Sequence, residues 1–339
     1  IAPRISNGRI ELGFKHITAE MLKKVNSIKI IGCGSAYHVG FVAGYFMRAA
    51  LRIPVESVLA SEFRYDDPIV DENTLAIVIS QSGETLDTLY GLREAKKHGA
   101  KTIAIVNVVG STIANESEDV LYTWAGPEIA VATTKAYSTQ LNAMYLIAMH
   151  FAQAMGTVTP EKKASVMKSL EELSDNVAKI LDNKEEIQYC ASKYYNSKSV
   201  FFLGRELDYA VALEGSLKLK EISYIHSEAY AAGELKHGTI ALIEEGTLVV
   251  ALCTVEKLFE KMLSNIKEVK ARGAVVIAVE GHTDIEKEAD HVIYVPRCDD
   301  TVLPSEVVVP LQLFSYYVAS LKGLDIDKPR NLAKSVTVE

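Results

Sequence analysis

The chain carries one pattern of strands and helices twice, and this duplication restricts the possible folds more than any other feature of the sequence. Apolar segments of strand length recur at an offset of about 170–174 residues, with helical patterns between most of them. Such alternation favours a parallel sheet covered by helices on both faces. The predicted fold class is therefore α/β, with two copies of one parallel-sheet unit. The matching segments are 28–31 and 200–203, 74–79 and 247–252, 103–106 and 275–279, and 120–122 and 292–294, with a further strand predicted at 55–58.

The segment 75–99 has the features of an anion-binding turn. A continuous apolar run at 75–79 predicts a buried strand, and a helical pattern begins at Thr85 and ends before Gly99. The free N–H groups and the dipole of a helix start favour an anion there, with phosphate as the candidate. The alternative is an N-cap cluster with water in the crevice. The side-chain donors of this turn are Ser80, Gln81, Ser82 and Thr85.

The corresponding turn of the second copy lacks these donors. Cys253, Thr254 and Val255 stand where the first copy has its serines, so only the first crevice is expected to be polar. The turn after the first strand, 32–37, also departs from a dinucleotide fingerprint, because Tyr37 stands where the third glycine belongs. We therefore expect neither NAD nor FAD, and no other cofactor.

Composition excludes several classes of protein. A net charge of −8 without a basic block argues against nucleic acid as a partner. No apolar run reaches the roughly 20 residues of a membrane helix, and the absence of a signal peptide before Ile1 predicts an excised fragment of a cytoplasmic protein. The four cysteines lie far apart and pair with no histidine at ligand spacing. We therefore expect no disulfides and no metal.

Two charged features distinguish the second copy. On a helix, Glu214, Lys218 and Glu221 would share one face, either as part of a site or as a surface ion-pair ladder. His237 lies in a short polar turn just before a predicted strand at 239–243, where a lone histidine is usually solvated.

The C-terminal tail surrounds one lysine with apolar residues. A chain terminus is disordered by default. Here, however, apolar anchors flank Lys334, and a lysine in an apolar pocket can act as an amine nucleophile. The expected anchors are Leu332, Ala333, Val336 and Val338.

Four runs of the sequence resemble the isomerase half of the glutamine–fructose-6-phosphate aminotransferases, the enzymes that make glucosamine 6-phosphate. These runs cover 80–85, 217–226, 229–238 and 329–339. The resemblance implies two tandem sugar-isomerase (SIS) domains, in agreement with the duplication. It also implies that the glutaminase half of the family is missing from this chain, and that the substrate and product are fructose 6-phosphate and glucosamine 6-phosphate.

The resemblance also implies roles for individual residues around the sugar phosphate. The phosphate loop matches Ser80, Gln81, Ser82 and Thr85, and the positions around the sugar match Ser35, Val131 and Thr133. The chain departs from some relatives at Ala36, where they have serine, which leaves one sugar contact unassigned.

The same resemblance implies the catalytic groups. Lys334 matches the lysine that forms a Schiff base with the open-chain ketose, and Glu221, with Lys218 beside it, matches the base that moves a proton between C1 and C2. His237 matches the histidine that opens the sugar ring and is supplied by the neighbouring subunit, which implies a homodimer. Such an isomerisation requires no metal or redox cofactor.

Domain boundaries and two alternative functions complete the expectations. The predicted order is an N-terminal segment (1–27), a first SIS domain (28–158), a helical connection (159–198), a second SIS domain (199–325) and an active-site tail (326–339). A non-catalytic sugar-phosphate sensor would need neither Glu221 nor Lys334. An isomerase that uses no ammonia would keep the carboxylate but not the lysine tail.

Overall fold

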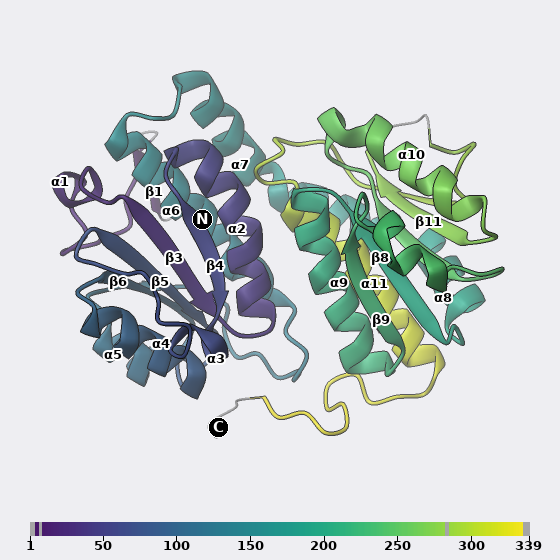
Figure 1. Cartoon of the computed structure of the whole chain (residues 1–339), viewed down its shortest axis with the longest axis horizontal. Coiled ribbons are helices and arrows are strands. Elements are labelled where there is room, and N and C mark those ends of the chain that lie inside the picture. The colour runs from purple at the N-terminus through teal and green to yellow at the C-terminus, as the bar shows by residue number, and fades with distance from the viewer. Residues whose placement is uncertain (1–3, 7–8, 282–284, 335–339) are drawn as a thin grey trace. The chain divides into compact units, whose positions relative to one another are not determined.

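The computed structural model describes all residues except 1–3, 7–8, 282–284 and 335–339, and the chain divides into two compact units (Figure 1). Unit 1 comprises residues 1–129, 133–171 and 333–339, and unit 2 comprises 130–132 and 172–332. Each unit contains one five-stranded parallel sheet, as the duplication predicted. The two units are described separately below.

The sheet of unit 1 has the strand order β4-β3-β5-β6-β7, and every neighbouring pair is parallel. All seven residues of the central strand β5 are buried, because helices cover both faces of the sheet. The strands are β3 (Ser27–Gly32), β4 (Val55–Leu59), β5 (Thr74–Ser80), β6 (Lys101–Val106) and β7 (Asp119–Tyr122), each within two residues of its predicted bounds.

The helices of unit 1 form two layers. One face of the sheet packs against α3 (Ala60–Phe63), α4 (Leu86–Lys97) and α5 (Thr112–Glu116), with the regularly spaced Leu89 and Leu92 in its core. The opposite face carries α2 (Ser35–Leu51) and α6 (Lys135–Met155). The N-terminal segment adds β1 (Ile5–Ser6), β2 (Arg9–Ile10) and α1 (Ala19–Leu22), and α7 (Pro160–Asp182) leads toward unit 2.

Unit 2 repeats this sheet with the order β12-β11-β10-β8-β9, again entirely parallel. Helices α8 (Glu185–Tyr194), α9 (Leu207–Ser223) and α11 (Pro304–Leu321) pack together, and α10 (Phe259–Lys270) packs into the core on the other face. The strands are β8 (Ser199–Gly204), β9 (His226–Ala231), β10 (Leu248–Leu252), β11 (Val275–Glu280) and β12 (His291–Tyr294). None of the helices in the described part of the chain is long and apolar enough to cross a membrane.

In unit 2 one local prediction was wrong and one strand was missed. The segment predicted as a strand at 239–243 is a 3-10 helix, Thr239–Leu242, which follows a first one at Leu235–His237. Its apolar residue Ile240 packs against the core from this 3-10 turn and not from a strand. No place in the sheet beside β8 is open to a further strand, because β9 and β10 already pair with it. The strand β9 was not predicted, because most of its residues are only half-buried and form no continuous apolar run.

Candidate functional site

The predicted phosphate loop lies at the switch point of the first sheet. Strands β4 and β5 lie on opposite sides of β3. The chain therefore runs from β3 to β4 on one side and then crosses to β5 on the other side of β3. In open parallel sheets, ligands bind beside the carboxyl ends of the strands at such a point. The turn that follows β5, residues 80–85, and the turn that follows β3, which leads to Ser35, therefore share this edge of the sheet.

Hydrogen bonds within the loop hold its backbone in one shape. The buried Ser80 hydroxyl accepts from the Gly83 N–H at 3.0 Å and bonds to the Thr85 hydroxyl at 2.9 Å. Ser82 accepts from the Glu84 N–H at 3.1 Å. Thr85 is the N-cap of α4 but makes no side-chain cap hydrogen bond, so its hydroxyl leaves the first N–H groups of that helix to another acceptor. This geometry favours an anion site over the alternative of a self-capped helix start.

Gly83 fits this turn for two reasons. Its φ of +69° lies in the left-handed region, where a side chain is unfavourable. A Cβ at this position would also lie 2.0 Å from the Ser111 hydroxyl oxygen. That oxygen is buried and has no hydrogen-bond partner among the described residues. The close approach of Ser111 to Gly83 therefore restricts the position of the loop backbone at Gly83.

The corresponding crevice of unit 2 is filled by a side chain of its own. Asp208 is buried at the start of α9, and its carboxylate accepts from the backbone N–H groups of Thr254 at 2.8 Å and Val255 at 3.3 Å, and from the Thr254 hydroxyl. Burial raises the pKa of Asp208 to about 6, although these three hydrogen bonds oppose the rise. The donors that would hold an external anion are thus already satisfied by an internal carboxylate.

The two copies match residue by residue at this place. The N-cap residues Gly34 and Glu206 have nearly the same backbone angles, with φ of 53° and 51°, and each is followed by a 17-residue helix. Ala36, the second helical residue in unit 1, therefore corresponds to Asp208 in unit 2. A methyl group offers no acceptor at this place in unit 1, whereas the Asp208 carboxylate accepts from two backbone N–H groups in unit 2.

Glu214, Lys218 and Glu221 of α9 form a largely buried cluster, not a surface ladder. Lys218 is 2% exposed; its ammonium pairs with Glu221 and lies 3.5 Å from the carboxylate of the fully buried Glu214. Burial alone would lower the pKa of Lys218, but the two carboxylates outweigh it and raise that pKa above its ordinary value. Only the Glu221 side chain, 21% exposed, reaches the surface of the cluster. The accessible carboxylate of Glu221 is thus held in place by the buried, positively charged ammonium of Lys218.

The start of the tail and a short linker lie beside the end of α9. The Val131 N–H donates to the Asp327 carbonyl at 2.9 Å, and the neighbouring Ala132 packs against Ile222, the residue after Glu221. Unit 2 therefore brings the predicted sugar contact Val131 close to the predicted base. Thr133, the next predicted contact, is half-buried at the boundary of unit 1.

Two contacts of Arg330 with Tyr224 anchor the tail. The Arg330 N–H donates to the Tyr224 hydroxyl at 2.8 Å, and the Arg330 guanidinium lies 4.1 Å from the centroid of the same ring. Lys334 is half-buried. The expected packing of Leu332 and Ala333 was wrong, because both are exposed, and the other expected anchors, Val336 and Val338, lie outside the described residues.

His237 is exposed at the end of the first 3-10 helix of unit 2. Its backbone N–H donates to the Glu234 carbonyl at 2.9 Å, which fixes the turn but leaves the ring directed to solvent. No hydrogen bond or ion pair in the described part of unit 2 joins this ring to Glu221. The structure thus groups the predicted residues as a phosphate turn in unit 1 and a carboxylate–lysine cluster with the tail anchor in unit 2.

Sequence reasoning missed Asp208 and Ser111 as determinants of these sites. Asp208 could have been found from the duplication, because the common offset aligns it with Ala36 directly after the glycine turn. Glu214 was placed on the correct face, but its burial depends on the packing of α9 against α11. Nothing in the sequence near Ser111 indicates that it contacts Gly83.

Comparisons with known proteins agree with this architecture. The model of the SIS domain family matches residues 21–150 and 193–322. A glutamine–fructose-6-phosphate aminotransferase (isomerizing) from Caldanaerobacter subterraneus subsp. tengcongensis is 60% identical over 99% of this chain, and the corresponding Thermus thermophilus protein is 49% identical over 99%. The chain spans 55% of the length of each of these two relatives.

A solved structure covers the same region as this chain. The C-terminal domain of glucosamine-fructose-6-phosphate aminotransferase from Francisella tularensis is 37% identical, with a TM-score of 0.91 over 97% of this chain and 93% of that domain. The chain therefore belongs to the SIS domain family, with two copies of the domain, and within it to the C-terminal domains of the glutamine–fructose-6-phosphate aminotransferases.

Proposed function

We propose that this chain is the isomerase half of an enzyme that makes glucosamine 6-phosphate from fructose 6-phosphate and glutamine-derived ammonia. A preceding glutaminase half would supply the ammonia, in agreement with the names of the relatives and with the share of their length that the chain spans. The observation that carries the proposal is the contrast between the two crevices. In unit 2 the Asp208 carboxylate accepts from the N–H groups of the turn, whereas in unit 1 the corresponding Ala36 offers no acceptor and Thr85 makes no side-chain cap hydrogen bond.

The phosphate turn supplies binding energy remote from the reacting carbons. Ser82 and Thr85 would donate hydroxyl hydrogen bonds to the phosphate of the sugar, together with Gln81, Ser35 and the first N–H groups of α4. Ser80 would hold the turn from inside, because its hydroxyl already bonds to Gly83 and Thr85. This binding energy orients C1 and C2 for reaction.

Glu221 would move the proton between C1 and C2. A positioned carboxylate that is accessible on one side can take a proton from one carbon and return it to the next. The buried Lys218 fixes the orientation of the Glu221 carboxylate through their ion pair. The Lys218 ammonium also pairs with Glu214, which holds the lysine in place. Lys218 therefore acts as a positioning residue, whereas Glu221 contacts the substrate.

Two further groups complete the proposed reaction. Lys334 would attack the C2 carbonyl of the open-chain sugar and form a Schiff base, with the tail held by the contact of Arg330 with Tyr224. His237 would open the sugar ring in the neighbouring subunit of a homodimer, which agrees with its exposed position. Val131 and Thr133 would contact the sugar from the linker. The steps assigned to these residues need no metal or cofactor.

The proposed boundaries follow the same assignment. The first SIS domain would extend over 28–158 and the second over 199–325, with a helical connection at 159–198. The N-terminal segment at 1–27 would follow the proposed glutaminase half, and 326–339 would form the active-site tail. We propose a cytoplasmic location for the enzyme.

The test is a comparison of Glu221→Gln with Glu260→Gln, an exposed glutamate on α10 that serves as a matched control. The parent chain should convert fructose 6-phosphate to glucose 6-phosphate in the absence of ammonia. Glu221→Gln should lower kcat by about 10²–10⁴-fold, the usual share of a positioned acid or base, while glucosamine 6-phosphate still binds. Glu260→Gln should match the parent.

Other outcomes would redirect the proposal. A parent chain that binds the sugar phosphates but never exchanges the C1 proton with solvent would be a sensor and not an isomerase. If Glu221→Gln exchanges that proton at the parent rate, the carboxylate belongs only to the buried ion-pair cluster.

A further inference from the structure

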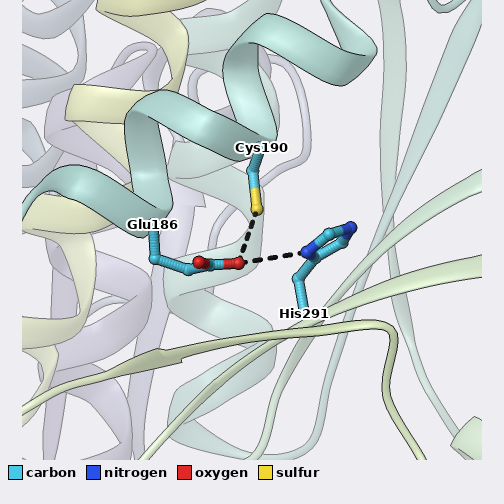
Figure 2. A group of neighbouring side chains, drawn as sticks. All are labelled: Glu186, Cys190 and His291. Carbon is cyan, nitrogen blue, oxygen red and sulfur yellow. Dashed lines mark hydrogen bonds and ion pairs between the residues drawn. The ribbon is translucent and has the colours of Figure 1, made fainter.

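A cluster of three metal-binding side chains lies in unit 2, on the side of the helical layer that faces β12 (Figure 2). Glu186 and Cys190 are one turn apart on α8, and His291 begins the edge strand β12. The Glu186 carboxylate accepts from His291 Nδ1 at 3.0 Å and from the Cys190 thiol at 3.7 Å. One ligand atom from each residue can be chosen so that all lie within 4.8 Å of one another.

We propose that Glu186, Cys190 and His291 bind a divalent transition-metal ion of the zinc class, which links α8 to β12. A thiolate, an imidazole and a carboxylate are the donors that Zn²⁺ prefers, whereas Mg²⁺ and Ca²⁺ prefer oxygen donors alone. Tetrahedral bonds of about 2.0–2.3 Å would place the ligand atoms roughly 3.3–3.8 Å apart. The separations of the Glu186 oxygen from His291 Nδ1 and from the Cys190 sulfur, 3.0 and 3.7 Å, are already close to that range.

The surroundings of His291 fit a metal ligand. The Tyr194 hydroxyl lies 2.9 Å from Nε2, so the second ring nitrogen has the outer partner that orients metal-bound histidines. The rings of Tyr189 and Tyr194 pack edge-to-face against the imidazole at centroid distances of 5.5 and 5.6 Å. These contacts hold the ring in a single orientation, with Nδ1 directed at the carboxylate.

The exposure of the three ligands provides a route for the ion. Cys190 is fully buried and His291 is 14% exposed, whereas the Glu186 side chain is 44% exposed. An ion can therefore enter from the Glu186 side and keep a water molecule in its fourth position. The thiol lies at the inner end of the site, away from solvent.

Metal binding rearranges two protons without any redox change. In the metal-free protein, the Cys190 thiol and a proton on His291 Nδ1 are both directed at the Glu186 carboxylate. The ion replaces both protons. The thiol proton leaves to solvent, and the imidazole proton moves to Nε2, where the Tyr194 oxygen can accept it. Three metal–ligand bonds form, and the metal keeps its oxidation state.

The ion would cross-link two elements that belong to different layers. Helix α8 packs on β12, which is the outermost strand of its sheet. A bond between them should stabilise the folded state by mass action. At a free Zn²⁺ concentration about one hundred times Kd, this linkage should raise the Tm of unit 2 by about 5–10 °C.

The experiment uses the whole chain and two metal ions. Titration with Co²⁺ should give a sulfur-to-metal charge-transfer band that saturates at one ion per chain, and Zn²⁺ should displace it. Cys190→Ala should abolish the band, and Glu186→Gln and His291→Asn should weaken binding at least 10-fold. Cys253→Ala removes another buried thiol of unit 2 and should leave the titration unchanged. Tyr194→Phe should weaken binding about 10–100-fold through the outer shell.

The proposal would be overturned by a band that persists in Cys190→Ala, by the absence of any band at saturating Co²⁺, or by Zn²⁺ binding that leaves the Tm of unit 2 unchanged. Glu186→Gln keeps the test independent of folding, because this half-exposed side chain lies at the surface.

Discussion

Replacement of Gly83 by alanine should separate two costs that the structure assigns to the phosphate turn. The first is the left-handed φ of +69°, which costs an alanine about 1–2 kcal/mol. The second is steric, because the new Cβ would lie 2.0 Å from the Ser111 hydroxyl oxygen and 2.5 Å from its Cβ. Overpacking of this kind costs about 1–3 kcal/mol. Gly83→Ala should therefore lower the free energy of unfolding by about 2–5 kcal/mol.

Gly110 is a matched control in the same unit. Its φ is +75°, and a Cβ there would have no atom within 4 Å. Gly110→Ala should thus lower the free energy of unfolding by only about 1–2 kcal/mol. The effect of alanine on the unfolded chain is common to both variants and cancels in the comparison. The double variant Gly83→Ala with Ser111→Gly removes the overlap and should return to the level of the control.

The assay is urea unfolding of unit 1 followed by fluorescence. Trp124 is the single tryptophan of the chain and lies in unit 1, so its emission reports on that unit. Calorimetry with glucosamine 6-phosphate gives the second readout, in which Gly83→Ala should bind more weakly and Gly110→Ala should match the parent. Equal unfolding free energies for the two alanine variants would refute the argument, since the Ser111 side chain would then not be held against Gly83.

Three further predictions follow from the same sites. Ser82→Ala with Thr85→Ala should weaken glucosamine 6-phosphate binding by about 1–3 kcal/mol per lost charge-assisted bond, and unchanged affinity by calorimetry would place the phosphate elsewhere. The folded-state pKa of Asp208, raised to about 6, means that its contribution to stability is present at low pH and is lost as the pH rises through that value. Relative to Asp208→Asn, the parent should therefore gain about 1 kcal/mol of unfolding free energy between about pH 7 and pH 5, and parallel pH profiles would contradict this. Borohydride should trap fructose 6-phosphate on Lys334, and Lys328→Arg should not affect the trapping, whereas a sugar mapped to another lysine would exclude the Schiff base.

The elements found from sequence are those whose signal is carried by apolar side chains. Strand β5 was predicted correctly because it is buried along its whole length, so its residues form one continuous apolar run. Strand β9 was missed for the opposite reason. Its residues are mostly half-exposed at the edge of the sheet, and backbone pairing with β8 holds it in place. The segment that contains Ile240 was predicted as a strand and is a 3-10 helix, because an apolar residue in a turn can reach a core as well as one in a strand.

The candidate site divides in the same way. The hydroxyl turn could be predicted because its chemistry and geometry follow from consecutive residues. The burial of Glu214 and Lys218 could not, because it arises from the packing of α11 against α9, almost one hundred residues apart in sequence. The cluster of Glu186, Cys190 and His291 was hidden for the same reason. Its cysteine and histidine lie on different elements, and the fold alone brings them together.

The Asp208 carboxylate has a consequence for how many ligands one chain can hold. An internal anion is covalently tethered beside its donors, so its effective concentration exceeds that of any metabolite in solution. Two copies of one fold should therefore give a binding stoichiometry of one sugar phosphate per chain and not two. The second copy would then contribute to the reaction through the charged residues of α9 and not through a phosphate of its own.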